Sequence, residues 1–238
     1  VAEDTGDGIT IGKRAGAKLD PDGNGQGGLW APVSLTTHKD GTTGLYPHIL
    51  LDRAKPGLIA VNAEGRRFVN EAVSYHDFVE AMFRANEISP AIPCQMICDS
   101  RFVRKYGLGN LHPGTTNLAA AAREGDIRVA DTIEALAADL GIDAKTLGGS
   151  VARHNRFARD GTDPDFGKGD TKLNRFNGDP GHRPNPCLGA IETAPFVALE
   201  VWPAELGCST GLATNADAQV IDEADAPIAG LYACGNDM

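Results

Sequence analysis

Helical and strand-like patterns along the sequence predict a mixed fold of helices and strands, in a chain long enough to bury a core. A stripe of apolar residues at helical spacing runs through residues 75–86, and two further helical patterns cover residues 131–161. Short apolar runs bounded by turn residues, at 58–61 and 93–98, are typical of strands. The 238 residues suffice for one large domain or two small ones with a sizeable core.

Composition excludes several classes of function. The chain carries 32 acidic and 22 basic residues, a net charge of −10, which argues against a nucleic-acid partner because such binding depends on basic patches. No apolar run reaches the roughly 18 residues of a membrane span, so none is predicted. The first residues lack the basic and apolar regions of a signal peptide, which predicts a cytoplasmic protein.

The five cysteines, at positions 94, 98, 187, 208 and 234, show no C-x-x-C spacing. A disulfide framework or a zinc site is therefore not expected, and no metal is predicted. Cys94 and Cys98 are expected to be core thiols on one face of a strand.

The first elements are a helix and a turn. Residues 5–19 suit a helix capped by Thr5, whose many small residues let another backbone approach closely. Gly23, Gly25 and Gly28 then match the G-x-G-x-x-G pattern of dinucleotide-binding folds. Because no apolar strand precedes them and no helix follows, we interpret this stretch as a flexible turn.

Strands and a helix follow. Two apolar runs, residues 49–51 and 58–61, are separated by charged residues and a proline-glycine turn, and the second enters another turn before residues 66–71, which predicts a hairpin. The helix 75–86, capped by Ser74, places its apolar stripe in the core. Residues 93–98 read as a buried strand ending at Asp99.

A pair of helices is predicted next. Asp131 and Glu134 form a capping box for a helix that stops at Gly141. Asp143 caps a second helix, which stops at Gly161 and carries His154 on its apolar face, where a packed core histidine is expected.

Regular periodicity disappears from residue 161 to 188. A loop of this length in a compact domain is usually functional or disordered, and Phe166, Leu173 and Phe176 are expected to anchor an ordered, functional loop. A strand at 196–202, a glycine-rich turn at 207–211, a short hairpin near 215–220 and a buried terminal strand within 227–238 complete the chain.

Four strings carry a family resemblance: K-P-G-L-I-A-V-N-A-E-G-R-R-F-V-N-E-A-V-S-Y, D-P-D-F-G-K-G-D, N-P-C-L-G-A-I and P-I-A-G-L-Y-A-C-G-N-D-M. In this order they resemble the FAD-dependent fumarate reductase/succinate dehydrogenase flavoprotein family, and within it the 3-ketosteroid Δ1-dehydrogenase branch. The resemblance spans nearly the whole chain.

The resemblance implies a domain organisation. Residues 38–207 would form the substrate-binding cap, an α+β domain, and residues 1–37 and 208–238 would be incomplete pieces of an α/β FAD-binding domain. Family members also carry a nucleotide-binding strand, glycine turn and helix, which this chain lacks. We therefore expect a piece of a longer enzyme, inactive and without flavin by itself, that self-associates through exposed flavin-domain faces.

The implied chemistry removes two hydrogens from adjacent carbons beside a ketone. Tyr75 matches the position of the tyrosine base, whose anion a neighbour such as His76 would stabilise. Glu71 is either a pocket carboxylate or a partner of Arg66 or Arg67. Lys168 stands where fumarate reductases of the family carry a proton-donating arginine.

The remaining predicted contacts are with substrate and cofactor. Phe176 and Gly207 are the further substrate-binding residues. Gly235 and Asn236 fall where the family contacts FAD. The alternatives to a 3-ketosteroid or related bulky ketone are a dicarboxylate, as in fumarate reductases, or a stand-alone ligand-binding or assembly module without flavin. Lysine in place of arginine disfavours the dicarboxylate.

Overall fold

The computed structural model describes residues 5–20, 27–37, 40–50, 52–208 and 210–238. Its helices are α1 (Asp7–Arg14), α2 (Tyr75–Asn86), α3 (Ser100–Tyr106), α4 (Leu118–Glu124), α5 (Ile133–Leu140), α6 (Ala144–Asp160), α7 (Lys172–Asn177) and the 3₁₀ helix η1 (Gly235–Asp237). Its strands are β1 (Gly28–Thr37), β2 (Thr43–Pro47), β3 (Leu58–Val61), β4 (Cys94–Asp99), β5 (Arg128–Ala130), β6 (Phe196–Cys208), β7 (Gln219–Ile221) and β8 (Pro227–Tyr232).

The chain separates into two compact units. The terminal unit comprises residues 1–30 and 205–238, and the central unit comprises residues 31–204. Each division falls inside a strand, in β1 and in β6. The assignment of the central unit to a substrate cap and of the terminal unit to an FAD-binding domain stays a prediction.

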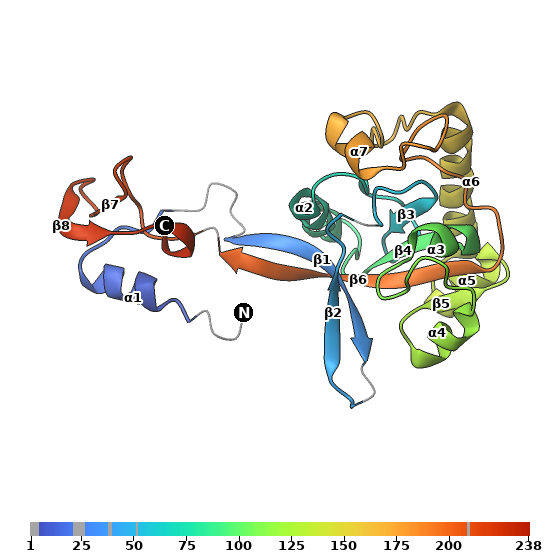
Figure 1. The fold of residues 1–238 in the computed structure, drawn as a ribbon, viewed down its shortest axis with the longest axis horizontal. Helices are drawn as coiled ribbons and strands as arrows, with labels where there is room; N and C mark the ends of the chain where they lie inside the picture. Colours follow the sequence, from blue (N-terminus) through green and yellow to red (C-terminus); the bar gives the residue numbers. More distant parts are fainter. Residues whose placement is uncertain (1–4, 21–26, 38–39, 51, 209) are drawn as a thin grey trace. The chain divides into compact units, whose positions relative to one another are not determined.

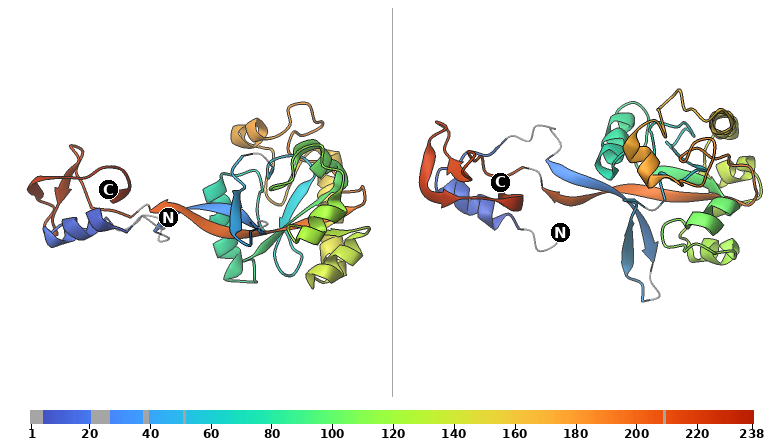
Figure 2. Two further views of the ribbon diagram at one scale, coloured as in Figure 1. Left: turned by 60° about the horizontal axis from the view of Figure 1, so that its bottom comes forward. Right: turned by 45° about the horizontal axis from the view of Figure 1, so that its top comes forward.

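The sheet of the central unit follows the order β2-β1-β6-β4-β3, with β5 also paired to β6 (Figure 1). The pairs β3–β4 and β4–β6 are antiparallel, and Ile59 lies opposite Ile97 in the first of them. Ile59 and Ile97 pack with Leu136 of α5 and Leu147 of α6, so these helices cover one side of the sheet. Figures 1 and 2 show α2 on the other side of β3 and β4.

Several predicted elements are confirmed. The helix α2 has the predicted bounds, and the Ser74 side chain accepts a hydrogen bond from the Asp77 amide at its start. The helix α6 begins after Asp143 and ends at Gly161, as expected. On β4, Cys94 and Cys98 are free thiols with no exposed surface, which confirms them as core residues.

Two predicted helix caps are wrong. Thr5 does not cap α1, because Gly6 occupies the cap position in a left-handed conformation with φ of 66°. The helix α5 is capped by Thr132, whose hydroxyl accepts from the Ala135 amide at 3.0 Å, and not by Asp131 one residue earlier. The threonine directly before the helix accepts from the amide three residues on, that of Ala135, whereas a cap at Asp131 would have used the amide of Glu134.

The predicted hairpin at 58–71 is reduced to one turn and one bridge. The turn at 62–65 forms, with the Gly65 amide donating to the Asn62 carbonyl, and Val61 pairs with Arg67 at a single position. The partner of β3 along its length is β4. The side chain of Glu71 accepts a hydrogen bond from the amide of Ala60. On the edge of β3 that does not face β4, this carboxylate therefore takes the place of a neighbouring strand.

The loop 161–188 is ordered, but two of its three predicted apolar anchors are wrong. Phe166 is partly buried, with the Arg67 guanidinium 4.9 Å from its ring centre. Leu173 and Phe176 on α7 are 48% and 85% exposed. The loop is held instead by buried polar side chains, among them Asp163, Lys168 and Asn174. Asn174, for example, donates to the Ala72 carbonyl at 2.8 Å and accepts from the Gly169 amide at 3.0 Å.

The terminal unit has a small core of its own. Ala17, Leu212 and Val220 are buried, and Ile228 and Leu231 of β8 pack against them from a partly buried position. The strand β8 forms as predicted and pairs with β7, but its other residues are exposed, so it is not the buried strand expected. A Cβ on Gly12 would lie 2.5 Å from the Leu212 side chain, so the helix has a tightly packed partner, although the group that approaches it here is a side chain and not the expected backbone.

Three findings limit other interpretations. No described helix is long and apolar enough to cross a membrane. The described residues contain no group of three or more histidine, cysteine or acidic side chains placed to hold a metal ion. Gly23 and Gly25 of the glycine-rich turn, the predicted boundary residue His38, Leu51 and Ser209 lie outside the described residues, while Gly28 starts a strand and not a nucleotide-binding helix.

Candidate active site

Tyr75 is the first residue of α2 in the central unit, and it stands outside the helix's buried stripe of Phe78, Val79 and Met82. Tyr75 and His76 are both partly exposed. The Ser74 hydroxyl fixes the start of the helix through the Asp77 amide at 3.1 Å. The helix therefore presents the tyrosine at a defined place, although its role as a base stays a prediction.

A buried ionic cluster joins the segment before Tyr75 to the loop 161–188. Arg67 donates through Nε and Nη2 to the two oxygens of Glu71, each at 3.0 Å, and also through Nη2 to Asp163 at 3.0 Å. Lys168 lies 3.1 Å from Glu71 and donates to the Leu58 carbonyl at 2.7 Å. Glu71, Asp163 and Lys168 have no exposed side-chain surface.

The charges of this cluster balance. Burial would raise the pKa of Glu71, but the positive charges of Arg67 and Lys168 outweigh it and hold that pKa well below its usual range. Burial lowers the pKa of Lys168, while Glu71 opposes the change. Two cations and two carboxylates therefore compensate one another inside the unit.

These contacts show which arginine is the partner of Glu71. It pairs with Arg67, whereas Arg66 contacts the exposed Glu64 at 3.2 Å. Neither Glu71 nor Lys168 has exposed side-chain surface, and the substrate contact of Glu71 and the proton-donating role of Lys168 stay predictions. Their physical role here is to fix the loop 161–188 to the segment that precedes Tyr75.

Phe176, the predicted substrate contact on α7, is 85% exposed. An apolar ring so exposed is free to contact a ligand or another part of the protein, and its substrate role stays a prediction.

The predicted cofactor residues lie together in the terminal unit. Gly235 starts the η1 turn with φ of 70°, and nothing lies within 4 Å of the position that a Cβ would take. Asn236 follows it and is exposed, and its amide nitrogen is 4.0 Å from the position of a Cβ on Gly207. A bare, open backbone turn beside an amide side chain fits close approach by a flat cofactor.

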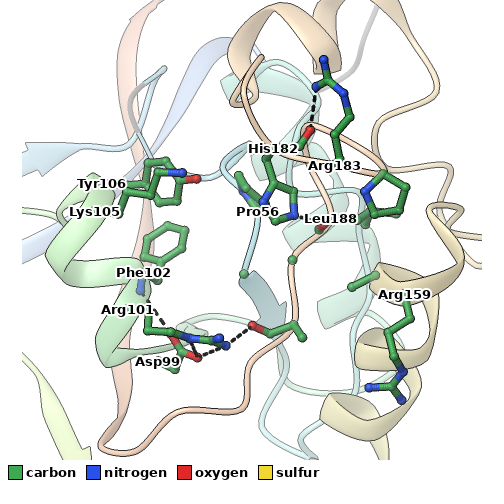
Figure 3. A pocket seen from close by; sticks show the side chains of 15 residues that line it. Pro56, Asp99, Arg101, Phe102, Lys105, Tyr106, Arg159, His182, Arg183 and Leu188 are labelled. Carbon is green, nitrogen blue, oxygen red and sulfur yellow. Dashed lines mark hydrogen bonds and ion pairs between the residues drawn. The ribbon is translucent and has the colours of Figure 1, made fainter.

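A cavity of about 390 Å³ lies within the central unit, and Tyr75 is not among the residues that line it (Figure 3). Phe102 and Tyr106 of α3 line one wall, and basic side chains surround the opening. Most of these cations already have carboxylate partners: Arg101 pairs with Asp99, Lys105 with Asp179 and Arg159 with Glu192. The cavity thus presents little uncompensated charge to an anionic ligand.

The structure also shows a residue that sequence reasoning missed. Arg53 is 3% exposed, and its guanidinium contacts the backbone of the segment before Tyr75. In the sequence it reads as part of a charged stretch between two apolar runs, which is the usual pattern of a surface turn. No local signal distinguishes a buried arginine of this kind from an exposed one.

Comparison with known proteins places these features in a family. The sequence profile of the FAD binding domain family matches residues 1–238. A 4-oxocyclohex-2-ene-1-carboxylate 5-dehydrogenase of Sinomonas cyclohexanicum is 39% identical over 97% of the chain and 39% of its own length. A 3-oxosteroid 1-dehydrogenase of Mycolicibacterium smegmatis is 33% identical over 98% of the chain and 40% of its own length.

A solved structure agrees with these relatives. The 3-ketosteroid Δ1-dehydrogenase of Sterolibacterium denitrificans, in complex with 1,4-androstadiene-3,17-dione, superposes with a TM-score of 0.88 at 36% identity. The match covers 100% of this chain and 42% of that one. The chain thus spans about two fifths of the length of each of these three proteins.

Proposed function

The chain belongs to the FAD binding domain family, and from that premise we propose that the complete protein is an FAD-dependent dehydrogenase of a cyclic ketone. The observation that carries the proposal is that three relatives, the two described above and a 4-oxocyclohexanecarboxylate 2-dehydrogenase of Sinomonas cyclohexanicum, are named as dehydrogenases of ring ketones and align over nearly all of this chain. A 3-ketosteroid is the first substrate to test, and 4-oxocyclohexanecarboxylate is the second.

The proposed reaction forms a carbon–carbon double bond beside the ketone. Tyr75 is the base that takes the proton from the carbon next to the carbonyl. FAD, when bound, supplies the acceptor for the hydride that leaves the neighbouring carbon. Gly235 and Asn236 would hold the cofactor, because the turn that they form is open and exposed.

Fumarate reduction is not proposed for this chain. That activity would need Lys168 to give a proton to a substrate, yet its side chain is completely buried, pairs with Glu71 and donates to the Leu58 carbonyl. The contacts of this lysine are those of a residue that stabilises the interior of the central unit.

The substitution Tyr75→Phe in the full-length protein tests the base. We expect kcat to fall by roughly 10²- to 10⁴-fold, the usual contribution of a general base, with flavin content unchanged. Exchange of the α-proton with deuterated solvent, followed by NMR, should fall in parallel. Tyr106→Phe is the matched control, because Tyr106 belongs to α3 and not to α2, and its hydroxyl donates to Asp179 at 2.6 Å.

Two results would contradict the proposal. Exchange at the parental rate in the Tyr75→Phe variant would remove Tyr75 as the base. Steady reduction of fumarate, with no turnover of either ring ketone, would place the protein in the other branch of the family.

A further inference from the structure

Arg53 holds together two segments of the central unit that are distant in sequence. Its Nε donates to the His48 carbonyl at 2.6 Å, and its Nη2 donates to the Ile49 carbonyl at 3.2 Å. Its Nη1 donates to the carbonyls of Glu71 at 2.9 Å and Val73 at 3.2 Å. One buried guanidinium thus binds four backbone oxygens, two upstream of it and two directly before Tyr75.

The charge of Arg53 is retained in this buried position. Burial lowers the pKa of Arg53 to about 10, against the opposing charges of Asp52 and Glu71, so the group stays protonated near pH 7. Asp52 is itself fixed, with one oxygen 2.6 Å from Nδ1 of His48 and the other accepting the Arg53 amide at 2.8 Å. The guanidinium also lies 4.9 Å from the ring centre of Phe78, in the first turn of α2.

The Ala72 carbonyl lies between the two carbonyls of this segment that Arg53 binds, and a side chain from another segment binds it. Asn174, which is 1% exposed, donates to the Ala72 carbonyl at 2.8 Å and accepts from the Asn70 side chain at 3.0 Å. Three consecutive carbonyls, at residues 71, 72 and 73, are therefore each bound by a buried side chain from elsewhere in the chain. This segment forms a turn with no sheet or helix ladder of its own, so these contacts determine its path.

We propose that Arg53 is a positioning residue for Tyr75, fixing the backbone before it and the helix turn after it so that the tyrosine stands in reacting geometry. The inference rests on the proposed function of Tyr75. Only arginine suits the place, because its planar fork reaches several acceptors at once, whereas a lysine ammonium is a point donor. Loss of this geometry should reduce the rate, since a displacement of about 1 Å can cost about 10²-fold.

The test is Arg53→Lys in the full-length FAD-bound protein, which keeps the charge and removes the fork. We expect kcat and α-proton exchange to fall together by about 10²-fold, with KM and flavin content nearly unchanged. In a Tyr75→Phe background the same substitution should cause almost no further loss, because both changes act through one group. A purely structural effect would instead multiply with the loss from Tyr75→Phe.

A second pair of variants keeps the test decisive if Arg53→Lys does not fold. Asn174→Ala removes the contact to the Ala72 carbonyl, and Asn155→Ala removes a similar buried contact, to the Ile191 carbonyl at 2.9 Å, far from Tyr75 in sequence. We expect Asn174→Ala to lower kcat and Asn155→Ala to leave it unchanged at equal loss of melting temperature. Equal kcat in both variants would overturn the inference.

The outcomes separate the inference from its premise. If Tyr75→Phe leaves kcat unchanged, the proposed function of Tyr75 is wrong and the positioning role falls with it. If Tyr75→Phe abolishes activity while Arg53→Lys and Asn174→Ala retain it, only the positioning role is wrong.

Discussion

The substitution Glu71→Gln gives the sharpest test of the buried ionic cluster. It preserves the shape of the side chain but leaves Lys168 without a carboxylate partner, while Arg67 keeps Asp163. Removing one partner of a buried ion pair costs about 3–5 kcal/mol, because the remaining charge is uncompensated. With a urea slope of about 2 kcal/mol/M, the unfolding midpoint should fall by about 2 M.

A second variant tests the reason for this loss. Adding Lys168→Met to Glu71→Gln removes one charge of each sign and fills a similar volume, so neutrality returns. The double variant should recover about half of the loss, the remainder reflecting the unpaired Leu58 carbonyl that Lys168 had bound. Urea unfolding followed by circular dichroism at pH 7 measures both. Glu64→Gln is the matched control, since Glu64 meets Arg66 at the surface, and it should cost less than about 1 kcal/mol.

The pH dependence adds an independent check. The folded pKa of Glu71 is lowered, so its contribution to stability is fully present above the ordinary carboxyl pKa of about 4.3 and is lost as the pH falls through the folded value. Stability of the parent should therefore decline below about pH 4 more steeply than that of Glu71→Gln. A loss under about 1 kcal/mol at pH 7, or additive losses in the double variant, would refute the reasoning.

Two further predictions concern a histidine and a helix cap. Burial lowers the pKa of His154 to about 3, so the unfolded state alone takes up a proton as the pH falls below about 6.5, and stability should drop by at most about 1.4 kcal/mol per pH unit. In His154→Gln, the free energy of unfolding measured with urea should change less between pH 6.5 and 5 than in the parent. Equal pH slopes in the two proteins would exclude His154 as the cause of the decline. Thr132→Ala should lower the free energy of unfolding, measured with urea, by about 1 kcal/mol, as the loss of a helix cap does. Asp131→Ala should change this free energy by less than about 0.5 kcal/mol. Equal losses in the two variants would contradict the assignment of the helix cap to Thr132 alone.

The helices and the core strands could be predicted from the sequence because their signals are local. Apolar spacing gives α2 its stripe, and an acidic or hydroxyl residue before the stripe with a glycine after it gives the bounds of α6. The anchors of the loop 161–188 could not be predicted in this way. Its aromatic Phe176 is at the surface, while the polar Asn174, two residues earlier, is buried.

The site shows the same division between local and distant signals. Tyr75 is identified by a contiguous motif, whereas its supports, Arg53 and Asn174, approach from about 20 residues upstream and about 100 downstream. A charged or amide residue in a turn usually points to solvent, so composition predicts exposure for both. Only the folded structure brings the Arg53 and Asn174 side chains to the backbone carbonyls before Tyr75.

The use of buried polar groups at this place has a physical rationale. Apolar packing around the segment 70–74 would avoid the cost of desolvating an ion, although it would leave the carbonyls of residues 71–73 unpaired, at about 1–3 kcal/mol each. Apolar contacts are not directional, however, and tolerate small shifts, whereas a guanidinium that meets four carbonyls and an amide that meets a fifth do so in one arrangement only. A residue that must stand within a fraction of an ångström of a substrate carbon needs that directionality more than it needs stability. The concentration of buried charge before Tyr75 is therefore itself an argument that geometry at the start of α2 matters to the protein.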